Sequence, residues 1–189
     1  MTTWLEREAR RLNKARALLR PALSEAGGVW ADLGCGEGVF TAVLAQLLSP
    51  GSDIYGVDKN RWAVEAMARH LSESYPQAAI HPVEADFTQP LSLPVLDGLV
   101  MANALHFVRR KRPLLVHLMN LLKPGGRLLI VEYNTSRDTV AVPYPLDEAG
   151  FLALAGEVGL RQAQIVTRVP STYLGQMYTG LGLAPQADG

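Results

Sequence analysis

Short apolar runs alternate with longer amphipathic stretches along most of this chain. The runs have the length and apolar content of buried strands, and they lie at 29–33, 53–58, 79–83, 96–102 and 128–133. Stretches with apolar residues at helical spacing separate several of them, at 39–48, 61–74 and 111–121. Strands that alternate with helices of this length form right-handed βαβ units. The pattern therefore predicts an α/β fold with a mostly parallel sheet.

The C-terminal part of the chain follows a different pattern. A polar loop over 134–145 leads to a helix over 147–158, and two further strands are expected over 164–169 and 171–178, separated by Pro170. A connection this short joins antiparallel strands, because a parallel pair needs a long crossover. We therefore expect an antiparallel strand at the C-terminal end of the sheet.

The N-terminal stretch is a predicted basic helix over residues 3–20, which Pro21 ends. A basic amphipathic helix can touch a membrane surface or RNA, but a solvated face on a helix that covers the sheet is the favoured interpretation. The expected organisation is a helical cap over 1–26, a ligand-binding domain over 27–183, and a disordered tail over 184–189.

Composition narrows the functional classes. The chain has 189 residues, a formal net charge of zero and a sequence pI of about 6.9, so no global field attracts nucleic acid or membranes. No apolar run reaches the roughly 20 residues that a membrane span needs, and the N-terminus has no apolar signal core. Its single cysteine, Cys35, excludes an internal disulfide and fits a reducing compartment. We expect a cytoplasmic protein, either a monomer or a homodimer, without a nucleic-acid partner or membrane insertion.

The first strand runs directly into a glycine-rich turn that contains Asp32, Gly34, Gly36 and Gly38, and a helix follows. Glycines allow positive φ and close approach of a ligand to the backbone, and the helix N-terminus offers free N–H groups. A dinucleotide fingerprint needs G-x-G-x-x-G, but here Val39 occupies the third position. The carboxylate of Asp32 also disfavours a pyrophosphate and favours a cationic ligand group. A nicotinamide-dependent oxidoreductase is therefore the weaker alternative.

Carboxylates also follow the second and third strands. Asp58 ends the second strand, where a carboxylate can accept hydrogen bonds from both ribose hydroxyls of an adenosine ligand. Asp86 follows the third strand and can accept from an adenine amine, while Phe87 offers a backbone N–H and an apolar wall. Trp62 either stacks on the adenine or belongs to the core face of its helix, and we weigh these alternatives equally. An adenosine-containing ligand is thus expected, although a ribose carboxylate alone does not identify it, because NAD also carries this ribose.

Taken in order, these motifs resemble those of the class I S-adenosylmethionine-dependent methyltransferases. The resemblance covers residues 29 to about 178 and rests on Asp32 with its glycine turn, Asp58, Asp86-Phe87, the segment 103–107 and the turn 121–126. The closest group is the small-molecule methyltransferases of ubiquinone and menaquinone biosynthesis. The resemblance implies a Rossmann-like three-layer αβα sandwich with a seven-stranded sheet whose C-terminal strand is antiparallel.

The resemblance also implies residue roles. The methionine part of S-adenosylmethionine, and of the product S-adenosylhomocysteine, would be held by Asp32 and the glycine turn. The expected cofactor-binding residues are Asp32, Gly34, Cys35, Gly36, Gly38, Asp58, Lys59, Trp62, Asp86, Phe87, Asn103 and Ala104. Asn103 and Ala104 would lie near the sulfonium, and the turn at 123–126 would be a structural marker. The motif N-P-P-[YF] is absent at 103–106, which argues against nucleobase amines and glutamine amides as substrates.

Methyl transfer from a sulfonium is an in-line displacement, so positioning supplies most of the rate. A base is needed only for a protonated nucleophile, and His106 is the candidate catalytic residue, although a role in shaping the pocket is an equal alternative. Glu132, Tyr133 and Tyr144 can contact substrate, but structural roles are favoured. Small size at a tight turn explains Cys35, and no metal-ligand spacing surrounds it or the histidines, so no metal is expected.

The favoured function is transfer of a methyl group from S-adenosylmethionine to an oxygen, nitrogen or carbon atom of a small molecule. The alternative is a non-catalytic module that keeps the adenosyl pocket for sensing or assembly. The 134–145 loop is short for a lid, so the acceptor pocket is expected to be open, or completed by the N-terminal helix or a second subunit.

Overall fold

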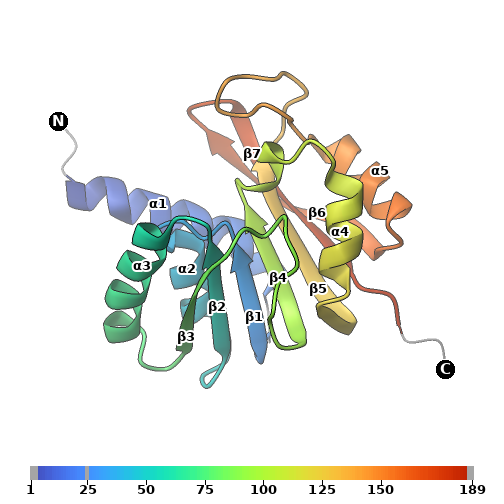
Figure 1. Cartoon of the computed structure of the whole chain (residues 1–189). Helices are drawn as coiled ribbons and strands as arrows, with labels where there is room; N and C mark the ends of the chain where they lie inside the picture. Colours follow the sequence, from blue (N-terminus) through green and yellow to red (C-terminus); the bar gives the residue numbers. More distant parts are fainter. Residues whose placement is uncertain (1–3, 24–25, 187–189) are drawn as a thin grey trace.

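The computed structural model describes residues 4–23 and 26–186 (Figure 1). Its helices and strands follow in the order α1 (Trp4–Leu19), the 3₁₀ turn η1 (Arg20–Ala22), β1 (Val29–Leu33), α2 (Val39–Leu47), β2 (Asp53–Asp58), α3 (Arg61–Ser74), β3 (Ala79–Glu84), β4 (Leu96–Ala102), η2 (Leu105–Phe107), α4 (Lys111–Met119), β5 (Leu122–Tyr133), α5 (Glu148–Glu157), β6 (Arg161–Ser171) and β7 (Gly175–Leu183). The predicted alternation of strands and helices is confirmed up to β5.

The strands form one seven-stranded sheet in the order β3-β2-β1-β4-β5-β7-β6. Strands β1 to β5 pair in parallel, whereas β7 is antiparallel both to β5 and to β6. The order reverses between β1 and β4, so a crevice opens at the carboxyl ends of these two strands, where ligands bind in open α/β sheets. The expected Rossmann-like sandwich with an antiparallel C-terminal strand is confirmed.

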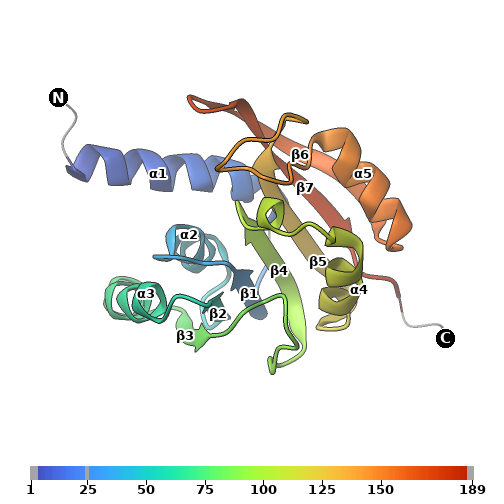
Figure 2. The same ribbon diagram turned by 45° about the horizontal axis from the view of Figure 1, so that its top comes forward.

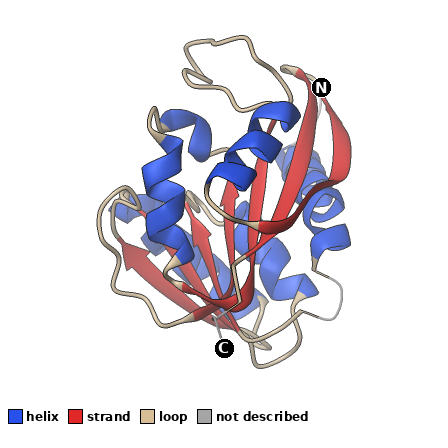
Figure 3. Ribbon diagram, turned by 90° about the vertical axis from the view of Figure 1, so that its right-hand side faces the viewer, coloured by secondary structure: helices blue, strands red, loops and turns tan. Residues whose placement is uncertain are grey.

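Helices cover both faces of the sheet (Figures 2 and 3). Helices α1, α2 and α3 lie on one face, and α4 and α5 lie on the other (Figure 2). Buried side chains fill both layers, with Trp30 and Leu44 in the first and Leu115 and Phe151 in the second. β1 and β4 are almost entirely buried because both faces are covered, which explains their continuous apolar sequence.

Helix α1 is fixed to the sheet by apolar packing and by hydrogen bonds to the C-terminal strands. Ala15, Leu18 and Leu19 are buried against the sheet and α2. The Thr179 hydroxyl of β7 donates to the Leu18 carbonyl at 2.8 Å, and Arg127 of β5 donates to a carbonyl of η1 at 2.9 Å. The N-terminal segment is thereby held against strands that follow it by more than a hundred residues.

The C-terminal hairpin differs from the prediction at its turn. Pro170 does not separate the two strands: it lies inside β6, opposite Gln176, and the turn falls at residues 172–174. β6 is an edge strand, and a proline is tolerated there because the missing N–H faces away from the partner strand. Both strands are longer than predicted.

Two shorter segments also differ from expectation. The stretch 123–126, expected as a turn before the fifth strand, lies within β5, where the pairing with β4 shifts between Leu96 and Gly98. The start of the expected disordered tail is ordered: Ala184 is buried, and its N–H donates to the Gly126 carbonyl at 2.8 Å. This bond continues the strand pairing one residue beyond β7. Residues 187–189 of the tail lie outside the described residues.

Candidate active site

The glycine turn after β1 is shaped by backbone hydrogen bonds and positive φ. The N–H groups of Gly34 and Cys35 both donate to the Val57 carbonyl of β2, at 2.8 and 3.1 Å. Gly34 has φ 78° and Gly36 has φ 52°, a region that favours glycine. A Cβ on Gly34 would lie 2.8 Å from the Cβ of Ala104, whereas one on Gly36 would meet no atom within 4 Å. The turn therefore brings bare backbone to the crevice between β1 and β4.

Gly38 is needed for the close packing of α3 against the turn. It is the N-cap of α2 with φ 87°, and a Cβ there would lie 2.4 Å from Cγ of Met67 on α3. Gly38 lines neither of the two cavities described below. Its place in the motif thus reflects the close packing of α3 against the turn, and the expectation that it contacts the cofactor is not supported by this geometry.

Asp32 is buried at the end of β1, and its side chain contacts α2. Its carboxylate accepts a 2.7 Å hydrogen bond from the Thr41 hydroxyl of α2, and the side chain lines neither cavity. Burial raises the pKa of Asp32 to about 6, despite the hydrogen bond from Thr41, which acts in the opposite direction. Sequence reasoning missed this partner, although a hydroxyl in the first turn of the following helix was visible in the sequence.

Asp58, at the end of β2, connects the turn to the neighbouring strand. One carboxylate oxygen accepts from the Gly36 N–H at 3.0 Å, and the other accepts from the Asn60 N–H at 2.9 Å. Asn60 in turn caps α3 through its side chain, which accepts from the Ala63 N–H at 3.3 Å. Asp58 is therefore held in one orientation beside the glycine turn, with further lone pairs free to accept.

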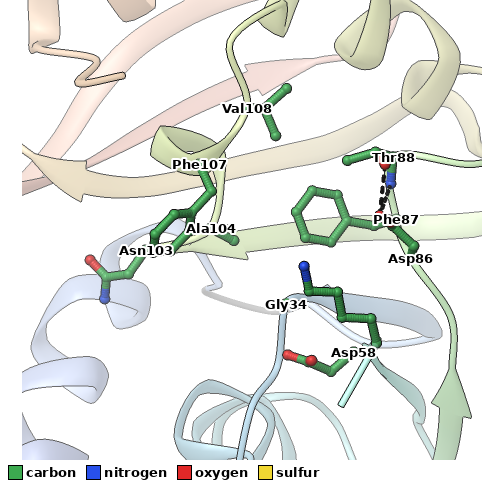
Figure 4. A pocket seen from close by; sticks show the side chains of 10 residues that line it. Gly34, Asp58, Asp86, Phe87, Thr88, Asn103, Ala104, Phe107 and Val108 are labelled. Carbon is green, nitrogen blue, oxygen red and sulfur yellow. Dashed lines mark hydrogen bonds between the residues drawn. The ribbon is translucent and has the colours of Figure 1, made fainter. Parts of the chain in front are cut away.

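The first cavity, of about 290 Å³, lies between Asp58 and the segment after β4. It is lined by Gly34, Asp58, Lys59, Asp86, Phe87, Thr88, Asn103, Ala104, Phe107 and Val108. In Figure 4 the Phe87 ring lies across this space from Ala104, above Asp58. We call this space the strand-end cavity. It brings together seven of the residues predicted to bind the cofactor and adds Thr88, Phe107 and Val108. Phe107 belongs to the 103–107 segment that the sequence singled out, whereas no sequence motif predicted the contacts of Thr88 and Val108.

Asp86 is held at the rim of the strand-end cavity by a local turn. One of its carboxylate oxygens accepts from both the N–H and the hydroxyl of Thr88, at 2.9 and 2.7 Å. These hydrogen bonds hold the pKa of Asp86 below its usual value, so the group is ionised at neutral pH. The other oxygen is available to a ligand.

The second cavity, of about 410 Å³, lies on the other side of the glycine turn, under α1. Its lining comes from the glycine turn, α2, the end of β4 and the C-terminal strands, and it includes Arg11 and Lys14 of α1. We call it the α1 cavity. Burial lowers the pKa of Lys14, whose ammonium forms no salt bridge with a carboxylate among the described residues. The basic face of α1, expected to be solvated, thus contributes two cations to a cavity.

Gly34 and Asn103 line both cavities, so the two spaces meet beside them. Asn103 has φ 53°, and its N–H donates to the Val131 carbonyl at 2.9 Å. Its side-chain oxygen is buried and has no hydrogen-bond partner among the described residues. Figure 4 shows this amide directed away from Phe87. A strained residue with an unpaired acceptor at the junction is typical of a ligand site.

His106 lies behind this junction and lines neither cavity. Its Nδ1 is 2.6 Å from one carboxylate oxygen of Glu132, and its backbone N–H donates to the other at 3.0 Å. Both side chains are almost completely buried. A carboxylate can only accept a hydrogen bond, so Nδ1 is the donor to Glu132. In the neutral imidazole, Nε2 is then the nitrogen without a proton. The sequence favoured a structural role for Glu132 over a substrate contact, but it did not indicate the pairing with His106.

Two other predicted residues have clear environments. Cys35 lines the α1 cavity, and burial raises the pKa of its thiol, so it is not a reactive nucleophile. Trp62 is 79% exposed on α3, so the alternative that it belongs to a core face is wrong. It lines neither cavity, so the alternative that it stacks on the adenine is not supported by this geometry. Over residues 4–23 and 26–186, no group of three or more His, Cys, Asp or Glu side chains is arranged to hold a metal ion. Helices long and apolar enough to cross a membrane are also lacking in these ranges.

Comparison with known proteins agrees with this geometry. Residues 31–128, which include the glycine turn, Asp58, Asp86 and the Asn103 segment, match the family model described as a methyltransferase domain. This match spans more than half of the chain, so the chain belongs to the methyltransferase domain family, as the sequence motifs predicted.

Individual relatives are similar over part of their length. A 2-phytyl-1,4-naphtoquinone methyltransferase from Nostoc punctiforme is 30% identical over 71% of this chain and 58% of its own. A trans-aconitate 2-methyltransferase from Pseudomonas paraeruginosa is 37% identical over 51% of this chain and 33% of its own. This chain therefore spans less than two thirds of the length of these curated relatives.

The fold is shared with solved methyltransferase structures. The N-methyltransferase NodS from Bradyrhizobium japonicum WM9, solved in complex with S-adenosyl-L-homocysteine, superposes with a TM-score of 0.68. The alignment covers 97% of this chain and 89% of that one at 18% sequence identity. At this identity the likeness concerns the fold alone.

Proposed function

We propose that this chain transfers a methyl group from S-adenosylmethionine to an oxygen, nitrogen or carbon atom of a small molecule. The observation that carries the proposal is the position of Asp58, which is fixed by the Gly36 N–H at the wall of the strand-end cavity. A carboxylate there meets the ribose of an adenosine ligand. Membership of the methyltransferase domain family makes the methyl donor the favoured adenosine ligand over NAD.

The adenosine part of the cofactor fits the strand-end cavity. Ribose hydroxyls donate to the free lone pairs of Asp58, with Lys59 beside it, and the adenine amine donates to the free oxygen of Asp86. The ring of Phe87 and the methyl group of Ala104 supply apolar contact. Both carboxylates that the sequence assigned to the nucleoside, Asp58 and Asp86, are used in this placement.

The methionine part fits the α1 cavity. Its carboxylate is attracted to Lys14 and Arg11, and its ammonium can donate to the unpaired side-chain oxygen of Asn103. Gly34 and Gly36 supply backbone without a Cβ in the way. Asp32 and Gly38 support this arrangement from behind, Asp32 through Thr41 and Gly38 through Met67.

When bound, S-adenosylmethionine supplies an electrophilic methyl group. The two cavities meet at Gly34 and Asn103, so the methyl group is expected to lie at this junction. The chain contributes position, which accounts for most of the rate in such displacements. For an acceptor that arrives protonated, we propose His106 as the base, acting through Nε2 while Glu132 holds Nδ1. The protein is further proposed to act in the cytoplasm, as a monomer or homodimer, on a small molecule rather than a nucleic acid.

The proposal is tested by measuring S-adenosylhomocysteine formation with a panel of small hydroxylated, amino and activated-carbon acceptors. Acceptor-dependent product formation that Asp58→Ala abolishes supports methyl transfer. Tight binding of S-adenosylmethionine without turnover on any acceptor contradicts it and favours the non-catalytic binding module. Hydride transfer with NADH would favour the oxidoreductase alternative.

A further inference from the structure

A third cavity, of about 340 Å³, lies between α4 and the loop over 85–95 that joins β3 to β4. It is lined by Thr88, Pro90, Val108, Arg110, Pro113, Leu114 and His117, and we call it the α4 cavity. Thr88 and Val108 also line the strand-end cavity, so the two spaces adjoin there. In Figure 4 these two residues lie on the side of Phe87 away from Asp58. The placement proposed above for S-adenosylmethionine uses the strand-end and α1 cavities and makes no use of this one.

The chain around the α4 cavity carries positive charge and no acidic residue. From 98 to 131 the sequence contains no Asp or Glu, although the whole chain has a formal net charge of zero. Residues 109–112 of this segment are Arg, Arg, Lys and Arg. Carboxylates from other segments do not compensate, because none lines the cavity. The α4 cavity therefore favours a negatively charged ligand group over a positive one.

Arg110 is the cation that this cavity offers. Its guanidinium lines the cavity and forms no salt bridge among the described residues. The neighbouring Lys111 is engaged elsewhere, since its ammonium donates to the Val108 and Tyr144 carbonyls at 2.9 and 2.7 Å. Arg110 is also the N-cap of α4, whose first turn has no acidic residue, so the helix dipole adds to the attraction. A carboxylate or phosphate group can pair with such a guanidinium through two parallel hydrogen bonds.

His117 contributes a buried polar atom. Its ring lines the cavity, and its Nε2 is buried without a hydrogen-bond partner among the described residues. Arg110 and His117 are seven positions apart, so both lie on the face of α4 that borders the cavity. Buried polar atoms are nearly always paired, and an exception is typical of a place where a ligand or a water completes the pairing.

The wall between these two polar groups is apolar. Pro113 and Leu114 lie between them on the same face of α4, and Pro90 and Val108 come from the segments opposite. An apolar wall with a few polar groups at fixed positions is the usual composition of a small-molecule site. An inorganic anion alone would leave this wall uncovered. The lining therefore suits a molecule with an apolar body and one anionic end.

We propose that the α4 cavity is a second ligand site, which takes a small organic anion. Its carboxylate or phosphate group pairs with Arg110, and its apolar body lies against Pro113 and Leu114. This site is separate from the one assigned to S-adenosylmethionine and shares with it only the wall formed by Thr88 and Val108. It does not depend on the proposed function, because no residue of the glycine turn and neither Asp58 nor Asp86 lines it.

The test is titration of the full chain with hexanoate, hexyl phosphate, hexanamide and acetate, followed by ligand-observed NMR with and without saturating S-adenosylhomocysteine. We expect hexanoate or hexyl phosphate to bind about tenfold more tightly than hexanamide, which lacks the charge, and than acetate, which lacks the apolar body. The tighter of these two anions identifies the headgroup. Hexanamide or acetate binding as tightly as both anions, or no binding of either anion, overturns the inference. Displacement of the anions by S-adenosylhomocysteine also overturns it, since it would place them in the strand-end cavity.

Variants locate the anion. Arg110→Met removes the charge and keeps an extended side chain, so the two anions should bind about tenfold more weakly. His117→Phe keeps a ring and removes both ring nitrogens, which should weaken the anions about threefold. The matched control is Arg112→Met, which removes a cation that lies on the same helix and does not line the cavity. Equal weakening in this control, or none in Arg110→Met, contradicts the inference.

S-adenosylhomocysteine affinity serves as an independent measurement on the same samples. Arg110→Met, His117→Phe and Arg112→Met should all keep the wild-type value, because none of these residues lines the strand-end or α1 cavity. Failure of S-adenosylhomocysteine to bind the wild type would contradict the proposed function and leave the anion titrations to decide on the α4 cavity, which separates the two failures.

Discussion

The strand-end cavity and the α1 cavity meet at Gly34 and Asn103 but are assembled from different parts of the chain. The first takes its polar groups from residues at or just beyond the ends of parallel strands, such as Asp58 and Asp86. The second draws its lining from segments as distant as Arg11 and Met177. Strand ends are marked in a sequence by apolar runs, whereas contacts between distant segments are not. The carboxylates at the strand ends can therefore be predicted from the sequence, whereas the contacts that assemble the α1 cavity cannot.

The largest expected effect comes from comparing Gly38, which packs against α3, with Gly36, which lines the α1 cavity. Gly38→Ala places a Cβ at positive φ against Met67, so we expect a loss of about 3 to 4 kcal/mol in the free energy of unfolding. Gly36→Ala meets open space and should cost only about 1 kcal/mol, while weakening S-adenosylmethionine binding. Denaturant unfolding of both variants checks this. Equal destabilisation would mean that the two glycines do not differ in role.

Asp58 tests the strand-end half directly. Asp58→Ala removes the acceptor for the ribose hydroxyls and for the Gly36 N–H, so affinity for S-adenosylmethionine should fall about a hundredfold. Asp53→Ala is the matched control, because it removes a carboxylate from the other end of the same strand, where His81 is its partner. Calorimetric titration of both variants distinguishes them. Unchanged affinity in Asp58→Ala would show that the ribose assignment is wrong.

Asp32 gives a pH test of the scaffold behind the site. Its pKa is raised to about 6 in the folded protein, so ionisation costs stability above that pH, and the cost disappears as the pH falls toward the unfolded value near 4. Asp32→Asn, which can still accept from Thr41, should therefore stabilise the protein at pH 8 by about 2 kcal/mol. The difference should vanish near pH 4. Unfolding curves at both pH values check this, and a pH-independent difference would contradict it.

The smallest expected effect concerns the α1 half. Lys14→Met removes one cation from the α1 cavity and keeps the length of the side chain, so S-adenosylmethionine affinity should fall about fivefold. Lower salt should enlarge the difference, because a partly exposed charge is screened by ions. Arg10 is a cation on the same helix that does not line the cavity, so Arg10→Met is the control. An effect of equal size in the control would assign it to the general charge of α1.

The sequence predicted the parallel strands and the carboxylates at their ends because both follow from local patterns. It did not predict that Asp32 bonds Thr41, that Gly38 faces Met67, or that His106 pairs with Glu132, since each depends on how separate elements pack. The Pro170 turn was misplaced for a related reason. Proline breaks a ladder only where its N–H is needed, and the sequence does not say which strand lies at the edge.

The central claim is that the strand-end and α1 cavities together hold S-adenosylmethionine. Calorimetric titration of the wild-type chain with S-adenosylmethionine and S-adenosylhomocysteine, with NADH as the control, tests it most directly. The account predicts micromolar binding of both adenosyl ligands at a stoichiometry of one and no binding of NADH. Binding of NADH alone would contradict the assignment of the glycine turn and of both cavities.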